Sequence, residues 1–184
     1  MIRAATTADI DAIEAGYTEL LLHEAEHGSN SQWELGVYPT RATAERAVET
    51  GTMFVMEEDG RICASMILNS HQAPEYREIS WLYPAVDDEV LVIHTLCVPP
   101  SMAGRGLGKR MVDFATGFGL GRGMRVLRLD TNKKNLPAQR LYLKNGWPEA
   151  AIACTRACST PSWSTLNDSC KKHPGPLVRG VLTI

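Results

Sequence analysis

The sequence predicts one mixed α/β (α+β) domain, with a twisted, mostly antiparallel sheet of about six or seven strands and helices on both faces. Three observations support this fold class. Two strand-like runs flank the turn sequence Glu58-Asp59-Gly60-Arg61, which is a strong hairpin signal. Residues 90–120 and residues 125–146 each have the pattern of a strand followed by a loop and a helix. The expected order of elements is βααβββαβαββ.

The first half of the chain is expected to hold two helices. Thr6, with Asp9 three residues later, forms an acidic capping box, and apolar residues then recur at helical spacing to about His27. Pro39-Thr40 begins a second helix that ends near Gly51. The strands expected in this half are residues 2–4, 52–56 and 62–68, while 79–83 either extend the hairpin or form a strand of their own. The elements expected next are a strand ending at Val98, a helix over 104–120, a strand over 125–131 and a helix capped by Asn135.

The C-terminal segment differs in composition from the rest. Residues 151–176 hold three of the five cysteines and show little periodicity. Strands are expected at 151–157 and, on a more regular pattern, at 177–184. The prediction is a single domain over residues 1–184, with 151–184 as a divergent C-terminal segment.

The composition is that of an ordinary globular domain. The chain has 184 residues, 44% hydrophobic and 22% charged, and its formal net charge of −2 gives no support for nucleic-acid binding. No apolar run is long enough to cross a bilayer, and the N-terminus lacks the pattern of a secretory signal. A cytoplasmic location without membrane or nucleic-acid partners is therefore expected, with the odd number of cysteines as free thiols.

The stretch from Val90 to Lys109 has the pattern of an anion site. An apolar strand ends at Pro99-Pro100, and the glycine-rich turn Gly104-Arg105-Gly106-Leu107-Gly108-Lys109 leads into a helix. Backbone N–H groups at the positive end of a helix favour an anion, most naturally a phosphate. A dinucleotide fold is disfavoured because GxGxxG spacing and a repeating βαβ pattern are absent, and no Gly-Lys-Ser/Thr follows for a P-loop.

A second motif accompanies this loop. Residues 130–142, Asp-Thr-Asn-Lys-Lys-Asn-Leu-Pro-Ala-Gln-Arg-Leu-Tyr, place an Asn and an Ala-x-x-x-Tyr helix after a strand, and Asn145-Gly146-Trp147 follows. Together the two stretches resemble the GCN5-related N-acetyltransferases (GNAT), over roughly residues 1–150. The family's phosphate loop begins with Arg or Gln, where this chain has Ala103. This departure concerns a side-chain contact, because backbone amides hold most of the pyrophosphate.

The resemblance implies the GNAT fold and acetyl-CoA as the acetyl donor. Leu96, Cys97 and Val98 are the implied backbone contacts of the pantetheine arm, on a strand that the family leaves splayed or bulged. An amide near Leu96 or Cys97 would polarise the thioester carbonyl. Asn135 is an implied pantetheine contact, although capping its helix is a sufficient explanation. The other implied contacts are Ala103, Gly104, Arg105, Gly106, Leu107, Gly108, Lys109 and Ala138, with positive charge from Arg105 and Lys109.

Two side chains are candidates for removing a proton from the acceptor amine, which is mostly protonated at neutral pH. His94 lies on the strand beside the expected acyl position, and some GNAT members, such as serotonin N-acetyltransferase, carry a catalytic histidine at a similar place. A core histidine bonded to a carbonyl explains it equally well. Glu89, at the start of the same strand, is the second candidate and would act through water, with a surface carboxylate as the alternative. Tyr142 matches the family tyrosine that protonates the departing thiolate, with a packing role as the alternative.

The sequence therefore favours an acetyl-CoA-dependent N-acetyltransferase that uses no metal. A primary amine attacks the thioester directly in a ternary complex, and no acyl-cysteine forms at Cys97. The acceptor is expected to be a small-molecule amine or a peptide N-terminus, and a homodimer is compatible with the sequence. The residues expected near the acceptor pocket are His27, Trp33, Tyr38 and Trp81.

Two alternatives remain open at this point. Ala103 and the C-terminal segment are compatible with a catalytically weak GNAT module that binds acyl-CoA as a sensor or partner. His23-Glu24-Ala25-Glu26-His27 matches HExxH, the helix signature of zinc hydrolases, although a solvated helix end explains it better. The Cys154, Cys158, Cys170 and His173 set fits no common zinc spacing.

Overall fold

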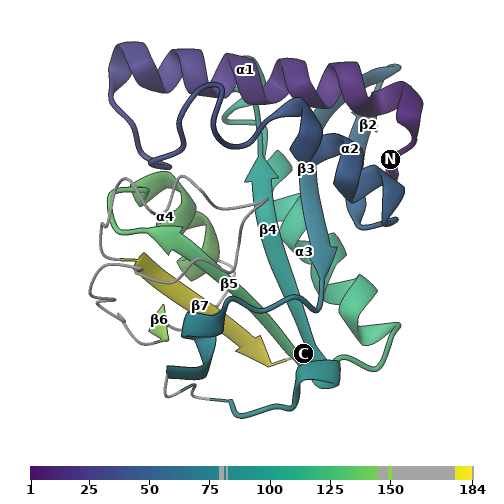
Figure 1. Cartoon of the computed structure of the whole chain (residues 1–184), viewed down its shortest axis with the longest axis vertical. Coiled ribbons are helices and arrows are strands. Elements are labelled where there is room, and N and C mark those ends of the chain that lie inside the picture. The colour runs from purple at the N-terminus through teal and green to yellow at the C-terminus, as the bar shows by residue number, and fades with distance from the viewer. Residues whose placement is uncertain (79–80, 82, 145–148, 151–176, 184) are drawn as a thin grey trace.

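The computed structural model describes residues 1–78, 81, 83–144, 149–150 and 177–183 (Figure 1). Over these residues the strands and helices follow the order βααβββαβαββ, which confirms the predicted fold class. Trp81 and Tyr83 lie in irregular backbone, and the rest of the expected strand 79–83 is outside the described residues. Also outside them are the expected strand 151–157, the helix end at Asn145-Gly146 and the cysteines at 154, 158 and 170.

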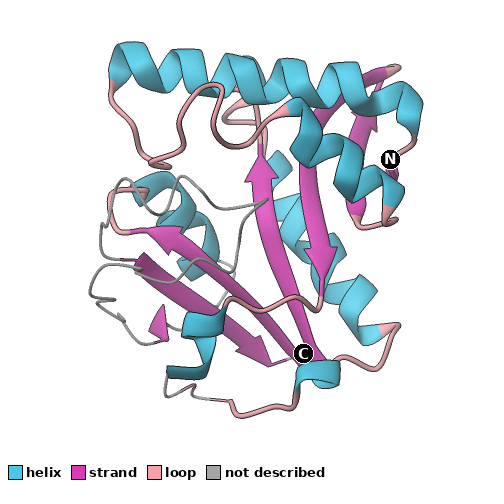
Figure 2. Ribbon diagram, in the orientation of Figure 1, coloured by secondary structure: helices cyan, strands magenta, loops and turns pink. Residues whose placement is uncertain are grey.

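The central sheet has seven strands in the order β1-β2-β3-β4-β5-β7-β6 (Figure 2). In chain order, β1 to β7 span Ile2–Ala4, Met53–Glu58, Arg61–Asn69, Val90–Cys97, Val126–Asn132, Glu149–Ala150 and Leu177–Thr183. The Asp59-Gly60 turn that joins β2 to β3 has positive φ at both residues, 50° and 74°, as tight hairpins require. Among the described strands, only β4 and β5 pair in parallel, and a helical crossover connects them.

Helices cover both faces of the sheet, and the alternation of side chains along β2 shows why (Figure 2). Met53 and Val55 face α1 (Ile10–His27) and α2 (Arg41–Glu49), where they pack against Ile13, Tyr17 and Ala44. Phe54 and Met56 face the opposite side, where the core includes Met111 and Val112 of α3 (Leu107–Leu120) and Leu141 of α4 (Leu136–Lys144). Within the described ranges, every helix is too short or too polar to span a bilayer.

The remaining part of the sheet is covered by Ala73, Tyr76, Trp81 and Ala85 of the β3–β4 segment. Val90 and Val92 of β4 and Val126 of β5 point away from the α3 core, and they form a small cluster with Tyr76 and Trp81. This segment, which contains the 3-10 turn Pro74–Glu78, therefore takes the place of a helix on that face.

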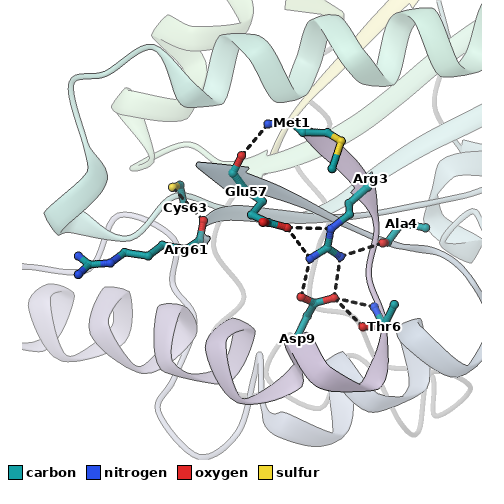
Figure 3. A network of polar contacts seen from close by, with 8 residues as sticks. All are labelled: Met1, Arg3, Ala4, Thr6, Asp9, Glu57, Arg61 and Cys63. Carbon is teal, nitrogen blue, oxygen red and sulfur yellow. Dashed lines mark hydrogen bonds and ion pairs between the residues drawn. The ribbon is translucent and has the colours of Figure 1, made fainter. Parts of the chain in front are cut away.

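The N-terminus is held by a compact charged network (Figure 3). The guanidinium of Arg3 bonds both carboxylate oxygens of Asp9 at 2.8 Å and an oxygen of Glu57 at 2.8 Å. Asp9 also accepts the backbone N–H of Thr6 at 2.7 Å, so it closes the predicted capping box. Arg3 holds the pKa of Asp9 well below its usual range through these hydrogen bonds. The network ties β1, β2 and the start of α1 together.

Asp9→Asn is expected to lower the free energy of unfolding by about 2 kcal/mol at neutral pH, because a charge-assisted pair and a helix cap are lost together. The stabilisation by Asp9 is fully present above its unfolded-state pKa of about 3.9 and disappears as pH falls through the lower folded-state pKa. Urea unfolding of both proteins at neutral and acid pH measures this. Asp11→Asn, which removes an exposed partner of Arg41, is the control and should change stability little. An equal loss in the two variants would contradict the role of the network.

Candidate active site

A β-bulge interrupts β4 one residue after His94. Ser65 of β3 pairs with Cys97 and Ile67 pairs with His94, so β4 carries one residue more than β3 across this interval. Thr95, inside the bulge, has φ of 49°, an uncommon conformation for a β-branched residue. The hydroxyls of Thr95 and Tyr38 are hydrogen-bonded at 2.5 Å, which fixes the bulge against the loop after α1. The bulge leaves Thr95 and Leu96 between the paired residues His94 and Cys97 and so takes their backbone out of the regular ladder.

β4 and β5 diverge from each other near the bulge (Figure 1). They pair only over Val90–Val92 and Val126–Arg128, and β5 then continues alongside β7 to Asn132. Among the described strands, the end of β4 has no neighbour on its β5 side. Its backbone donors and acceptors therefore face the opening between the two strands, which is what a peptide-like ligand arm needs.

The glycine-rich loop leads directly from this opening into α3. Gly104 and Gly106 have φ of 77° and 72°, and nothing lies within 4 Å of the position that a Cβ would take at either residue. The first helical hydrogen bond runs from Arg110 N–H to Gly106 O at 3.2 Å, so the amides of residues 107–109 precede it and have no helical acceptor. Free amides at a positive helix end fit the pyrophosphate of coenzyme A.

The charged side chains of the loop are already paired. Arg105 binds Glu58 at 2.7 Å, Arg110 binds the same carboxylate, and Lys109 binds Asp113 at 2.7 Å. Ala103 donates its N–H to Pro100 O at 3.0 Å, so it stabilises the turn before the loop. The backbone amides of the loop are therefore the groups that remain available to an anion, since Arg105, Lys109 and Arg110 are in ion pairs.

His94 is half-buried on β4, and burial favours the neutral form of its imidazole. Its Nε2 lies 3.1 Å from Asn69 Oδ1, which also accepts the N–H of His71 at 2.8 Å. Burial lowers the pKa of His94, while the charge of Asp130 and a backbone hydrogen bond with His71 oppose that shift. A neutral imidazole of this kind can accept a proton near neutral pH.

Tyr142 lies on α4 and packs against the α3 core. The predicted motif is formed: Asn135 Oδ1 accepts the N–H of Ala138 at 3.2 Å, so Asn135 caps the helix that carries Tyr142. Burial, and then the negative charge of Asp130, raise the pKa of Tyr142 above its usual value. Its hydroxyl therefore stays protonated at neutral pH, as a proton donor must, and is a weaker acid than that of a free tyrosine.

Asp130 is a functional candidate that the sequence reasoning missed. Its carboxylate accepts the hydroxyl hydrogen of Tyr76, and its charge acts on both His94 and Tyr142. The signal available in the sequence was the alternation Arg128, Asp130 and Asn132 on one face of an otherwise apolar strand. Asp130 is thus placed to stabilise an imidazolium at His94 and to keep Tyr142 protonated.

Glu89 is engaged elsewhere. It ends the 3-10 turn Asp87–Glu89 at the start of β4, where its carboxylate pairs with Arg125 at 2.9 Å. The hydrogen bond from Arg125 lowers the pKa of Glu89, which makes it a weaker base. Five residues of strand, about 17 Å, separate it from His94. The geometry favours His94 over Glu89 for proton removal.

Cys97 points into the core under α1 and is only 1% exposed. Its Sγ donates to Gly16 O at 3.7 Å, and burial raises the pKa of the thiol to about 12. A thiol in this environment is a poor nucleophile, so only the backbone of Cys97 is available to the opening.

The four residues expected near the acceptor lie at different distances from the bulge in β4. Tyr38 reaches the bulge, and Trp33 packs edge-on against Tyr38 with ring centroids 5.8 Å apart. Trp81 packs on β5, with its ring 4.3 Å from the Arg128 guanidinium carbon. Among the described residues, the hydrogen bond of His27 stays within α1, where Nδ1 lies 2.9 Å from His23 O.

The HExxH match is part of a helix end. The carboxylate of Glu24 accepts the N–H of Ser31 at 3.0 Å and the hydroxyls of Ser29 and Ser31, so it holds the loop that follows α1. His23 and His27 stack on each other with centroids 4.2 Å apart. In the part of the chain that the structure describes, no three His, Cys, Asp or Glu side chains are grouped as metal ligands.

Comparison with protein families agrees with this architecture. The model of the acetyltransferase (GNAT) family matches residues 17–147, which include both the glycine-rich loop and the Asn135–Tyr142 helix. No curated protein gives a significant match to the chain.

Solved structures of similar fold cover the whole chain. A GNAT-family acetyltransferase from Streptococcus agalactiae has a TM-score of 0.77 at 21% identity, over 100% of this chain and 95% of its own. A ribosomal-protein-alanine N-acetyltransferase from Brucella melitensis gives 0.67 at 14%, over 100% and 99%. The yncA protein of Salmonella typhimurium, in a structure with its cofactor acetyl-CoA, gives 0.63 at 18%, over 100% and 92%. At these identities the likeness establishes a shared fold.

Proposed function

Because the chain belongs to the GNAT acetyltransferase family, we propose that it transfers an acetyl group from acetyl-CoA to a primary amine by direct attack in a ternary complex. The observation that carries this proposal is that three features lie together at the end of β4. A bulge exposes backbone groups beside a neutral histidine, and the glycine-rich loop follows within ten residues.

The chain's own backbone would hold the donor. The amides of residues 104–109 would bind the pyrophosphate, and the splayed backbone of Leu96 and Val98 would pair with the amide groups of the pantetheine arm. Asn135 already caps α4 through its Oδ1, so its NH₂ group is the part available for a further contact. Acetyl-CoA supplies the acetyl group as a thioester.

Two side chains would move protons during transfer. His94 takes a proton from the amine, whose nitrogen then forms a bond to the acetyl carbonyl carbon. As the carbon–sulfur bond breaks, Tyr142 donates its hydroxyl proton to the departing sulfur. The nitrogen loses its second proton to water as the amide forms, and Tyr142 regains a proton from the solvent. An amide near Leu96 or Cys97 would stabilise negative charge on the carbonyl oxygen. Asp130 stabilises the positive charge that forms on His94.

Titration with acetyl-CoA followed by a thiol-release screen over pools of amines tests this proposal. Binding of acetyl-CoA and amine-dependent release of coenzyme A are the expected results. Binding without release from any amine would favour the sensor module instead. A metal-dependent hydrolytic activity of the protein in the absence of acetyl-CoA would favour the zinc hydrolase.

Gly106→Ala is expected to weaken acetyl-CoA binding several-fold and to cost about 1 kcal/mol of stability, because a side chain at φ of 72° is strained. Gly117→Ala is the matched control. Gly117 lies inside α3 with nothing within 4 Å of its Cβ position, so alanine should stabilise the protein by about 0.5–1 kcal/mol and leave binding unchanged. Calorimetric titration and thermal unfolding measure both effects. Equal affinities in the two variants would argue against the loop as the pyrophosphate site.

A further inference from the structure

A cavity of about 590 Å³ opens on the face of the sheet that carries Arg128. Its lining comes from β5 and from the segment between β3 and β4, and includes Gln72, Tyr76, Arg77, Trp81 and Arg128. Tyr76 and Trp81 belong to the apolar cluster that covers Val90, Val92 and Val126, so one wall is aromatic. The lining also carries charge, positive on Arg77 and Arg128 and negative on Asp87.

Arg128 is buried far more than an arginine usually is, at 4% exposure. Its Nη1 donates to Gln72 Oε1, and its guanidinium stacks on Trp81 at 4.3 Å. Its Nε is buried without a hydrogen-bond partner among the described residues. The fold therefore positions this side chain firmly and satisfies it only in part.

Neither Asp87 nor Asp130 forms an ion pair with Arg128. Asp87, whose charge raises the pKa of Arg128, accepts Gln72 Nε2 at 2.8 Å, and Asp130 accepts the hydroxyl of Tyr76. Burial lowers the pKa of Arg128, yet an arginine does not lose its proton in proteins. A buried charge outside an ion pair is costly, and a ligand carboxylate that paired with Arg128 would offset that cost.

The position of Arg128 relates it to the proposed chemistry. Arg128 pairs with Val92 across the parallel β4–β5 contact, and His94 follows Val92 on the same face of β4. The two side chains therefore start about 7 Å apart along the strand direction. Tyr76 joins the two regions, because it lines the cavity and bonds Asp130, whose charge acts on His94.

We infer that this cavity binds the carboxylate of the acceptor through Arg128, so that the acceptor is a small amine of the amino-acid class. The inference rests on the proposed function and specifies its substrate. The planar fork of arginine matches a carboxylate, and Arg77 on the rim adds a second positive charge. Tyr76 and Trp81 supply the apolar contact for the amino-acid side chain. A peptide N-terminus, whose α-carboxyl is converted to an amide, lacks the recognised group.

The first test uses the wild-type protein alone. Initial rates are measured for the standard amino acids and for the corresponding amino-acid amides, in which the carboxylate is replaced by a neutral group of similar size. We expect kcat/KM to be about 100-fold higher for the preferred acids than for their amides, as for other buried charge pairs. Equal rates, or faster acetylation of the amides, would overturn the inference.

The second test replaces the charge with a side chain of similar length. Arg128→Met should lose the preference for acids over amides while stability stays unchanged or rises, because a charge without a partner is removed. Arg122→Met is the control: Arg122 also stacks on an aromatic ring, that of Phe118 at 3.5 Å, but it lies outside the cavity. It should leave the acid preference intact. A large loss of stability in Arg128→Met would show that the arginine serves the fold and would contradict the inference.

Failure of the inference can be distinguished from failure of the proposed function. If coenzyme A is released with amines but without an acid preference, only the substrate class is wrong. If no amine of either kind releases coenzyme A, the carboxylate site can still be tested by binding. Calorimetric titration of the amino acids into the wild-type protein and into Arg128→Met provides that test. Binding that the variant loses would support a carboxylate site, and equal or undetectable binding in both would contradict it.

Discussion

Tyr142→Phe should lower kcat by about 100-fold or more while acetyl-CoA binding is retained, because only the proton for the departing thiolate is removed. The ring keeps its packing against the α3 core, so the fold should be unaffected. Steady-state rates and calorimetric titration of acetyl-CoA separate the two effects. An alkylthiol of low pKa leaves without protonation, so an acyl donor with such a leaving group should restore much of the lost rate.

Tyr83→Phe provides the control for this prediction, since Tyr83 is exposed and lies outside α4. It should turn over at the wild-type rate. An unchanged kcat in Tyr142→Phe would remove Tyr142 from the reaction and leave it as a packing residue.

His94→Gln should reduce kcat/KM by about 100-fold and flatten its pH dependence on the acid side. The base is the neutral imidazole, so wild-type activity falls as pH drops through the pKa of His94. Burial lowers that pKa, and the fall should therefore begin below the ordinary histidine value of about 6.5. Glutamine keeps an amide that can bond Asn69, so the surrounding turn is preserved. Rates of the two proteins from pH 5 to pH 9, each with saturating acetyl-CoA, provide the measurement.

His23→Gln is the matched substitution, because His23 is exposed at the end of α1 and stacks on His27. Its pH profile should follow the wild type. If the acid limb persists in His94→Gln, another group removes the proton, and Glu89→Gln becomes the variant to measure.

Sequence patterns predicted those turns, caps and loops that depend only on neighbouring residues. The Asp59-Gly60 hairpin, the Thr6–Asp9 cap and the loop at Gly104–Gly106 each depend on neighbouring residues, and each is present. The strand Leu177–Thr183 was also predicted, although its residue pattern did not indicate that it pairs with β5. Pairing partners are set by long-range packing, which periodicity does not encode.

The candidate site was predicted less completely, for the same reason. The bulge at Thr95 lies within an unbroken apolar run, and its cause is the register against β3 together with a hydroxyl contact from Tyr38, 57 residues away. Arg128 and Asp130 bond partners 56 and 54 residues away in the β3–β4 segment. Their chemistry depends on those contacts, so the sequence showed only two charged residues in an apolar strand.

The central claim is that acetyl transfer to an amine is direct and occurs at the opening between β4 and β5. Initial rates over a matrix of acetyl-CoA and amine concentrations, with the best acceptor from the screen, test it most directly. Direct attack in a ternary complex predicts double-reciprocal lines that intersect and an N-acetylated amine as the product. Parallel lines, together with an acetylated form of the protein, would contradict it, because they require a covalent intermediate.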